Sequence, residues 1–266
     1  MLFRSKGGVG KSTVTLNLAV ALAETGARVG LLDADIYGPS IPLMIGTKEK
    51  PVTEAGRIEP VVKDGIKVMS MGFLVPENQP VVWRGPMIHG ALTQFLTQVN
   101  WGELDYLLID LPPGTGDIHL TLVQTVPVTG AVIVTTPQKV ATTDALKGLS
   151  MFRQKQINVP ILGIIENMSW FTPAELPDSR YFIFGTGGGQ GLADKYDVPL
   201  LGQIPLVQSI RESGDSGLPA ILKEGITSQA FENLSESLAR QIAIRNADRK
   251  STRLNSSHVA LSRMPS

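Results

Sequence analysis

The chain has 266 residues, enough for one large α/β domain or two small ones, and its 24 basic and 24 acidic residues argue against a polybasic nucleic-acid surface over the whole molecule. No apolar run approaches the about 18 residues of a membrane span, and the start shows no signal segment, so we expect a cytoplasmic protein that binds neither membrane nor nucleic acid. The absence of cysteine excludes disulfides, thiolate catalysis and any cysteine-ligated metal site within the chain.

The first motif is a glycine-rich loop, S-K-G-G-V-G-K-S-T (5–13), which leads into a helix predicted over residues 11–24. Glycines let the backbone approach a ligand closely, and a helix start directs N–H groups and a positive dipole end toward one point. The loop matches the P-loop pattern G-x-x-x-x-G-K-[ST], except that Ser5 replaces the first glycine. The alternative is a loop that only caps the helix.

As a P-loop, this stretch is a phosphate site. Lys11 is expected to reach the β- and γ-phosphates, and the Ser12 hydroxyl is expected to bind Mg²⁺. We expect the whole loop to contact the nucleotide, which adds Lys6, Gly7, Gly8, Val9, Gly10 and Thr13. The P-loop pattern alone leaves the position of Lys6, ahead of the glycines, unexplained.

Beyond the loop, strand-like and helical patterns alternate, which is typical of a mostly parallel sheet with helices on both faces. Strands are predicted at residues 28–33, 106–110, 131–135 and 161–165. Further helices are predicted at residues 87–99, 144–154 and 228–244. Residues 36–66 are rich in proline, glycine and charge, and we expect a lobe of loops and short strands there.

Both ends of the sequence are unusual. Only three residues precede Arg4, whereas a P-loop should follow a strand of about five, so we expect a truncated first strand. We assign residues 1–247 to one ATPase-like α/β domain and expect residues 248–266 to be a disordered tail. Residues 251–266 show no helical or strand period, and they resemble translated sequencing-adaptor DNA more than a native segment; the alternative is an ordinary disordered terminus.

Two acidic segments complete the candidate site. In L-L-I-D-L-P-P-G-T-G-D (107–117), Asp110 ends an apolar strand, a Walker B pattern, and is expected to reach Mg²⁺ through water. In D-A-D-I-Y-G-P-S (33–40), Asp33 and Asp35 lie on the same side of an extended chain. We expect Asp35 to orient the attacking water and keep Asp33 as a possible Mg²⁺ ligand. The alternative is that one of them caps the turn at residues 38–39.

Together these segments resemble the deviant-Walker-A ATPases of the Min/ParA/nitrogenase-iron-protein class, and within it the Mrp/ApbC iron–sulfur cluster carrier proteins. The resemblance runs from residue 5 to about residue 245. It also rests on M-S-M-G-F-L-V (69–75), V-V-W-R-G-P-M (81–87), E-N-M-S-W-F (166–171) and G-Q-I-P-L-V-Q-S-I-R-E-S-G-D-S-G-L-P (202–219). It implies a P-loop NTPase fold, ATP and Mg²⁺ as cofactors, slow ATP hydrolysis, a homodimer, and iron–sulfur client or assembly proteins as partners.

The resemblance also gives roles to three residues. Lys6 corresponds to the signature lysine that reaches across the homodimer to the partner's ATP, where its charge offsets the negative charge that develops on the phosphates. Asn167 would bind the adenine by a hydrogen bond. Residues 202–205, which end at Pro205, would form part of the adenine pocket.

The missing cysteines are the main departure from the family. Its cluster carriers place a C-x-x-C pair shortly after the N-M-S motif, so that two subunits hold a [4Fe–4S] cluster with four thiolates. The equivalent stretch here, residues 170–185, contains no cysteine. Other residues that could ligate iron weakly are Glu175, Asp178, His89, His119 and His258, and we expect the histidines to be surface or packing residues.

The sequence therefore leaves several functions open. Either this branch delivers clusters with ligands borrowed from a partner, or it keeps the fold and the nucleotide switch for another client. The alternative function is a Min- or ParA-like positioning switch on a membrane or nucleoid. A Min-type switch calls for a basic amphipathic C-terminal helix, but Glu232 and Glu236 lie opposite the apolar face of residues 228–247. We expect that helix to dock on the core.

Overall fold

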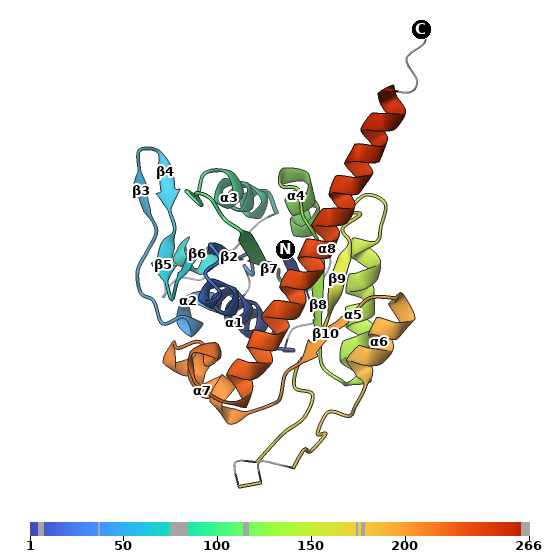
Figure 1. The fold of residues 1–266 in the computed structure, drawn as a ribbon. Helices are drawn as coiled ribbons and strands as arrows, with labels where there is room; N and C mark the ends of the chain where they lie inside the picture. The colour runs from blue at the N-terminus through green and yellow to red at the C-terminus, as the bar shows by residue number, and fades with distance from the viewer. Residues whose placement is uncertain are drawn as a thin grey trace.

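A computed structural model describes residues 1–4, 8–36, 38–74, 85–113, 117–173, 175–176 and 179–261, without the side chains of residues 3, 4, 117 and 251–261. Its main sheet contains β1 (Leu2–Arg4), β2 (Val29–Asp33), β5 (Val61–Lys63), β6 (Ile66–Ser70), β7 (Tyr106–Asp110), β8 (Ala131–Thr135), β9 (Ile161–Glu166) and β10 (Leu200–Gln203). The strand order is β10-β9-β8-β1-β7-β2-β6-β5, and only β5 pairs antiparallel (Figure 1). A separate hairpin is formed by β3 (Val52–Glu54) and β4 (Arg57–Glu59).

Helices cover both faces of the sheet. One face carries α1 (Lys11–Glu24), α2 (Ile41–Met44), α7 (Gln208–Ser216) and α8 (Ile226–Leu261). The other carries α3 (Gly85–Thr97), α4 (Asp117–Thr125), α5 (Lys139–Phe152) and α6 (Gly188–Tyr196). Two short 3₁₀ turns, η1 (Met71–Leu74) and η2 (Ala220–Leu222), complete the structure.

The central strands β2 and β8 are largely apolar because both of their faces are buried. On β8, Val132 and Val134 pack toward α1 and α8, whereas Ala131 and Ile133 pack toward the helices of the opposite face. This alternation follows from the period of two along a strand. It confirms the predicted α/β fold, a mostly parallel sheet between two helical layers.

Several predicted elements have the observed bounds, namely the helix at 11–24 and the strands at 106–110 and 131–135. The lobe expected at 36–66 contains α2 and the short strands β3 to β5. Helix α5 begins at Lys139, earlier than predicted. The apolar period did not indicate this start because an apolar residue of the first turn, Val140, is 63% exposed. The strands β6 and β10 and the helices α4, α6 and α7 were not predicted.

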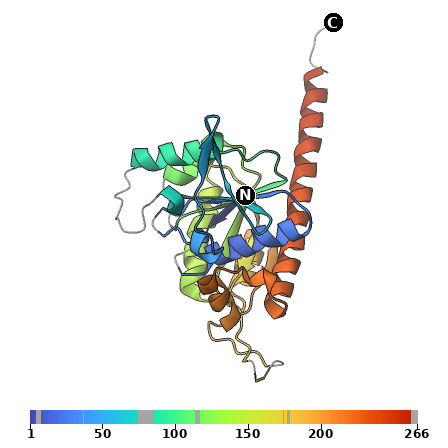
Figure 2. The ribbon, with the colours of Figure 1, turned by 90° about the vertical axis from the view of Figure 1, so that its left-hand side faces the viewer.

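The C-terminal helix, α8, runs into the segment that we predicted to be a disordered tail. Phe231, Leu234 and Leu238 of α8 are buried against the sheet, which confirms that the helix docks on the core. The helix then continues past the body of the molecule to Leu261 (Figures 1 and 2). Each residue added to a formed helix gains one backbone hydrogen bond, so a helix can continue through a sequence with no apolar period. The domain boundary at residue 247 and the foreign origin of the tail stay predictions.

The first strand positions the P-loop. β1 is three residues long, against five for β7 and for β8, and it pairs in parallel with both of them. In the strand order, β2 lies on the β7 side of β1, whereas β8 lies on the opposite side of β1. Such a reversal of strand order opens a crevice at the carboxyl edge, where ligands of open α/β sheets bind.

Candidate nucleotide site

Polar side chains form a row along the carboxyl edge of the sheet. On one side of β1, the strand register places Asp110 beside Asp33 and Asp33 beside Ser70. On the other side, it places Glu166 of β9 beside Gln203 of β10. The P-loop follows β1 and therefore emerges between a pair of buried acids on one side, Asp110 and Asp33, and a single buried acid on the other, Glu166.

The loop itself leaves the start of α1 available for an anion. Gly8 and Gly10 both have positive φ, 85° and 78°, a conformation that side chains other than glycine rarely adopt. A Cβ on Gly10 would lie 2.5 Å from the Asn167 Nδ2 atom, so any larger residue at this position would displace the Asn167 side chain. No side chain caps α1, and no acidic residue lies in its first turn. Its first N–H groups are therefore suited to a phosphate.

Lys11 and Ser12 meet on one carboxylate. The Lys11 Nζ atom lies 2.5 Å from Asp110 Oδ1, and the Ser12 hydroxyl donates to Asp110 Oδ2 at 2.5 Å. Asp110 is fully buried and Lys11 is 6% exposed. Burial raises the pKa of Asp110, although the charge of Lys11 and the two hydrogen bonds act in the opposite direction. The structure thus brings these three predicted residues together.

Asp33 makes contacts of another kind. Its carboxylate accepts hydrogen bonds from the Ser70 hydroxyl at 2.9 Å and from the backbone N–H groups of Asp35 at 3.1 Å and Ile41 at 3.3 Å. Burial, with a further effect of the neighbouring Asp110, raises the pKa of Asp33 to about 7. These contacts favour a role in stabilising the turn after β2, and its role as a Mg²⁺ ligand stays a prediction.

Asp35 faces the P-loop. It lines a cavity of about 240 Å³ with residues of the loop, the start of α1, α2 and the segment after β7, including Gly8, Gly10, Lys11, Ser12, Thr13, Ser40, Met44 and Pro113. Hydroxyl and carboxylate oxygens are the protein ligands of Mg²⁺, which usually binds one or two of them and the phosphates of its nucleotide. Ser12 and Asp110 therefore fit a Mg²⁺–phosphate group, and Asp35 lines the same cavity as Ser12.

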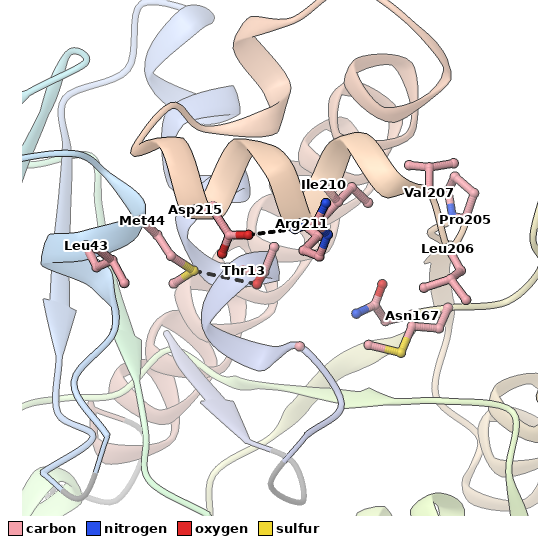
Figure 3. Close-up of a pocket in the computed structure, with 13 residues that line it drawn as sticks. Thr13, Leu43, Met44, Asn167, Pro205, Leu206, Val207, Ile210, Arg211 and Asp215 are labelled. Atoms are coloured by element: carbon pink, nitrogen blue, oxygen red, sulfur yellow. Dashed lines mark hydrogen bonds and ion pairs between the residues drawn. The ribbon is translucent and has the colours of Figure 1, made fainter. Parts of the chain in front are cut away.

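A second cavity, of about 320 Å³, opens on the other side of Thr13, with α7 along one side and α2 along another (Figure 3). Its lining is largely apolar and includes Gly10, Thr13, Leu43, Met44, Asn167, Met168, Pro205, Leu206, Val207 and Ile210. An ion pair on α7, Arg211 with Asp215 at 2.9 Å, also lines it. A largely apolar cleft with a few polar groups is typical of a site for a nucleotide base.

Asn167 joins this cavity to the P-loop. Its Nδ2 atom donates to the Val9 carbonyl at 2.8 Å, and its backbone N–H donates to the Thr135 carbonyl at 2.7 Å. Asn167 and Pro205, which the family resemblance assigned to the adenine, thus line one cavity next to the loop. Their contact with a base stays a prediction.

Other predicted residues lie elsewhere. Lys6, Gly7 and Asp178 lie outside the described residues, and so does the side chain of His258. The His89 Nδ1 atom contacts the Thr121 hydroxyl at 2.8 Å, and His119 is buried with its ring 6.0 Å from that of Phe152. Among the described residues, no group of three or more histidine, aspartate or glutamate side chains is arranged to hold a metal ion.

Sequence reasoning missed the apolar wall from α7 and the acid Glu166. The α7 sequence, Q-S-I-R-E-S-G-D-S, has one apolar residue in nine, so periodicity did not predict a helix there. Its apolar residue, Ile210, lines the second cavity. Two signals pointed to Glu166 without giving it a role: it ends an apolar strand, as Asp110 does, and it begins the E-N-M-S-W-F segment of the family resemblance.

Comparison with known proteins agrees with this geometry. The family model of the NUBPL iron-transfer P-loop NTPases, ParA, matches residues 1–243. The chain belongs to this family. The fold and the iron–sulfur carrier resemblance predicted from the motifs are thereby confirmed.

Two relatives and one solved structure show what this NUBPL-family chain is similar to. It is 53% identical to the iron–sulfur cluster carrier protein of Synechocystis over 246 residues, 90% of this chain and 69% of that one. It is 48% identical to the iron–sulfur cluster transfer protein NUBPL of Dictyostelium discoideum, over 92% of this chain and 76% of that one. A nucleotide-binding protein of Archaeoglobus fulgidus, solved in complex with ADP, is 41% identical, with a TM-score of 0.72 over 84% of this chain and 88% of that one.

Within the described part of this family member, no helix combines the length and the apolar character needed to span a membrane.

Proposed function

We propose that this NUBPL-family protein binds Mg²⁺–ATP, hydrolyses it slowly, and uses the nucleotide state to pass iron–sulfur clusters to apo client or assembly proteins. The observation that carries the nucleotide part is the meeting of Lys11 and Ser12 on Asp110, beside the cavity that Asp35 lines. The cluster part is supported by the names of its relatives in Synechocystis and Dictyostelium.

In the proposed reaction the P-loop binds the phosphates. The first N–H groups of α1 and the ammonium of Lys11 offset their negative charge. Ser12, together with Asp110 through a water, would hold a Mg²⁺ ion, which would supply further positive charge against the phosphates. Asp35 orients a water toward the γ-phosphorus, where a new P–O bond forms as the bond to the β–γ bridging oxygen breaks. Positioning and charge neutralisation dominate phosphoryl transfer, so a single water-orienting carboxylate is sufficient for slow turnover.

The base occupies the second cavity in this proposal. Asn167, which also contacts the P-loop at the Val9 carbonyl, and Pro205 line this cavity, and side chains of α7 line another part of it. The adenine would be bound mainly by apolar contact, with the side-chain amide of Asn167 as a polar partner.

We infer a homodimer in which Lys6 acts on the ATP of the second subunit. The support is the family resemblance and the position of Lys6 ahead of the glycines. Lys6→Ala should bind ATP but hydrolyse it poorly. Mixing Lys6→Ala with Lys11→Ala should restore part of the activity. In the mixed dimer the Lys11→Ala subunit still has Lys6 and donates it to the ATP that the Lys6→Ala subunit binds. No recovery in confirmed mixed dimers would show that Lys6 does not act across subunits.

The cluster is a cargo, and the side chains of this chain do not fit direct [4Fe–4S] ligation because the sequence contains no cysteine. We therefore propose that a partner supplies the thiolates during transfer. After anaerobic reconstitution with iron and sulfide and then desalting, the homodimer alone should retain no cluster and still bind ATP. Near-stoichiometric iron and sulfide per dimer would overturn this assignment.

The Min- or ParA-like positioning function finds no support in α8. Its apolar residues Phe231, Leu234 and Leu238 are buried in the core and are not available for a lipid surface. The decisive experiment for the proposed function is Mg²⁺-dependent phosphate release from ATP, measured beside cluster transfer to an apo [4Fe–4S] acceptor with and without ATP. Absence of both nucleotide binding and phosphate release would overturn the ATPase proposal.

A further inference from the structure

Glu166 is a buried acid for which the proposed reaction has no use. It is the last residue of β9, directly before Asn167, and it is 1% exposed. Its Oε2 atom accepts a hydrogen bond from the Gly189 backbone N–H at 2.6 Å, and its Oε1 atom accepts one from the Gln203 Nε2 atom at 2.6 Å. Burying a carboxylate is costly unless such bonds compensate the lost water, so this position needs an explanation.

The two donors belong to different elements. Gly189 lies in the first turn of α6, where backbone N–H groups have no partner within the helix. A Cβ on Gly189 would lie 2.8 Å from the Cβ of Glu166, so glycine permits this close approach. Gln203 ends β10, two residues before Pro205. One carboxylate therefore links β9 to the start of α6 and to the end of β10.

The backbone around Glu166 makes the same connection. The Glu166 carbonyl accepts from the Ile204 N–H at 2.9 Å and from the Ser169 hydroxyl at 2.8 Å. Met168, the second residue after Glu166, adopts a left-handed conformation with φ of 57°. The turn that carries Asn167 is thus held on several sides, and its amide reaches the Val9 carbonyl of the P-loop.

We propose that Glu166 is a positioning residue for the nucleotide base. Its side chain holds the turn of Asn167 and the segment of Pro205 at a constant separation, and these two residues form one wall of the base cavity. It thereby sets the affinity for the nucleoside part of the ligand and leaves the phosphate half unchanged. This inference rests on the proposed nucleotide-binding function.

The test separates base from phosphate with two probes, ADP and inorganic tripolyphosphate, each in the presence of Mg²⁺. Glu166→Ala should weaken ADP binding about tenfold, the size expected when hydrogen bonds to a buried charged group are lost. Its affinity for tripolyphosphate should stay within about twofold of the wild type, because Lys11 and the α1 N-terminus are intact. In steady state, KM for ATP should rise while kcat stays constant. A merely structural role would weaken both probes together.

Two further variants sharpen the result. Glu166→Gln should retain most of the ADP affinity. The amide oxygen of the introduced glutamine can accept from the Gly189 N–H, and the Gln203 amide can turn so that its oxygen accepts from the NH₂ group of the introduced glutamine. Glu166→Ala in an Asn167→Ala background should cause little further loss, since the acid acts through Asn167. Trp101→Phe is the matched control: it removes one buried hydrogen bond, to the Phe95 carbonyl, far from the P-loop.

Gln203→Ala is the second variant for the case that Glu166→Ala does not fold, because Gln203 is exposed and its truncation leaves no cavity in the core. It removes one of the two donors and should weaken ADP binding in the same direction by about threefold. Unchanged ADP affinity in a folded Glu166→Ala or Gln203→Ala protein, or equal losses for ADP and tripolyphosphate, would overturn the inference. A wild-type protein that binds neither probe would instead overturn the proposed function.

Discussion

The carboxyl edge of the sheet holds buried carboxylates on both sides of the P-loop, and the two sides differ in what those carboxylates contact. On the β7 and β2 side, Asp110 binds a lysine and a serine of the loop, beside a second acid, Asp33. On the β9 side, Glu166 binds a backbone N–H and a side-chain amide. The first arrangement concentrates charge at a cavity, and the second joins elements to one another.

The difference suits the two halves of the proposed nucleotide site, which have different requirements. The phosphate half needs charges and hydroxyls at definite positions, and the residues that we propose for it come from short motifs: residues 8–13, Asp35 and Asp110. The base half needs a wall of the right shape, and the cavity that we propose for it is lined by residues distant in sequence, such as Asn167, Pro205 and Ile210. Substitutions should therefore abolish function in the first half and weaken it in the second.

The largest effect is expected for Lys11→Ala. Lys11 is the cation at the start of α1, so its loss should reduce Mg²⁺–ATP affinity by more than about a hundredfold. Titration with a fluorescent ATP analogue measures this, and circular dichroism checks the fold, because Asp110 loses its ion-pair partner. Lys147→Ala, which removes an exposed lysine, is the control and should bind normally. Unchanged affinity in Lys11→Ala would rule out the P-loop assignment.

Asp35→Ala should separate turnover from binding. The carboxylate is proposed to orient water, so kcat should fall about a hundredfold while the Kd for Mg²⁺–ATP changes by less than about threefold. Phosphate release at saturating ATP and equilibrium titration give the two numbers. Equal losses in both would assign Asp35 a structural role in the phosphate cavity.

Asn167→Ala tests the base half. The amide lines the base cavity, so its loss should weaken ADP binding about tenfold and leave tripolyphosphate binding unchanged. Calorimetric titration of both ligands makes the comparison, with Asn233→Ala on the exposed side of α8 as the matched control. If the affinity for tripolyphosphate falls as much as the affinity for ADP, Asn167 supports the P-loop through Val9 and does not recognise the base.

The smallest effect is expected from the pH dependence of Asp33. Its pKa is raised from 3.8 to about 7 on folding, so the folded state binds more protons than the unfolded state between these values. Its contribution to stability is therefore lost as the pH rises from about 4 to about 7. Asp33→Asn lacks this titration, and its melting temperature should fall less between pH 5 and pH 8 than that of the wild type. Parallel melting curves would show that Asp33 does not carry the pH dependence.

Local pattern determined much of this protein. The P-loop and the helix at 11–24, with the apolar strand that ends at Asp110, follow from glycine positions, helical period and strand period, which depend on neighbours in sequence. The same motifs identified the family, because phosphate chemistry requires definite residue types at short spacing. The residues that we propose for the phosphate half could therefore be named from the sequence.

Only the tertiary structure decided the rest. Period two places Asp33 and Asp35 on one side of an extended chain, but only the packed turn shows Asp33 bound to Ser70 and Asp35 lining the P-loop cavity. The wall around Ile210 and the contacts of Glu166 join strands and helices that are distant in sequence. Their positions depend on the order and register of parallel strands, which pairing across the whole sheet sets and no local window of residues contains.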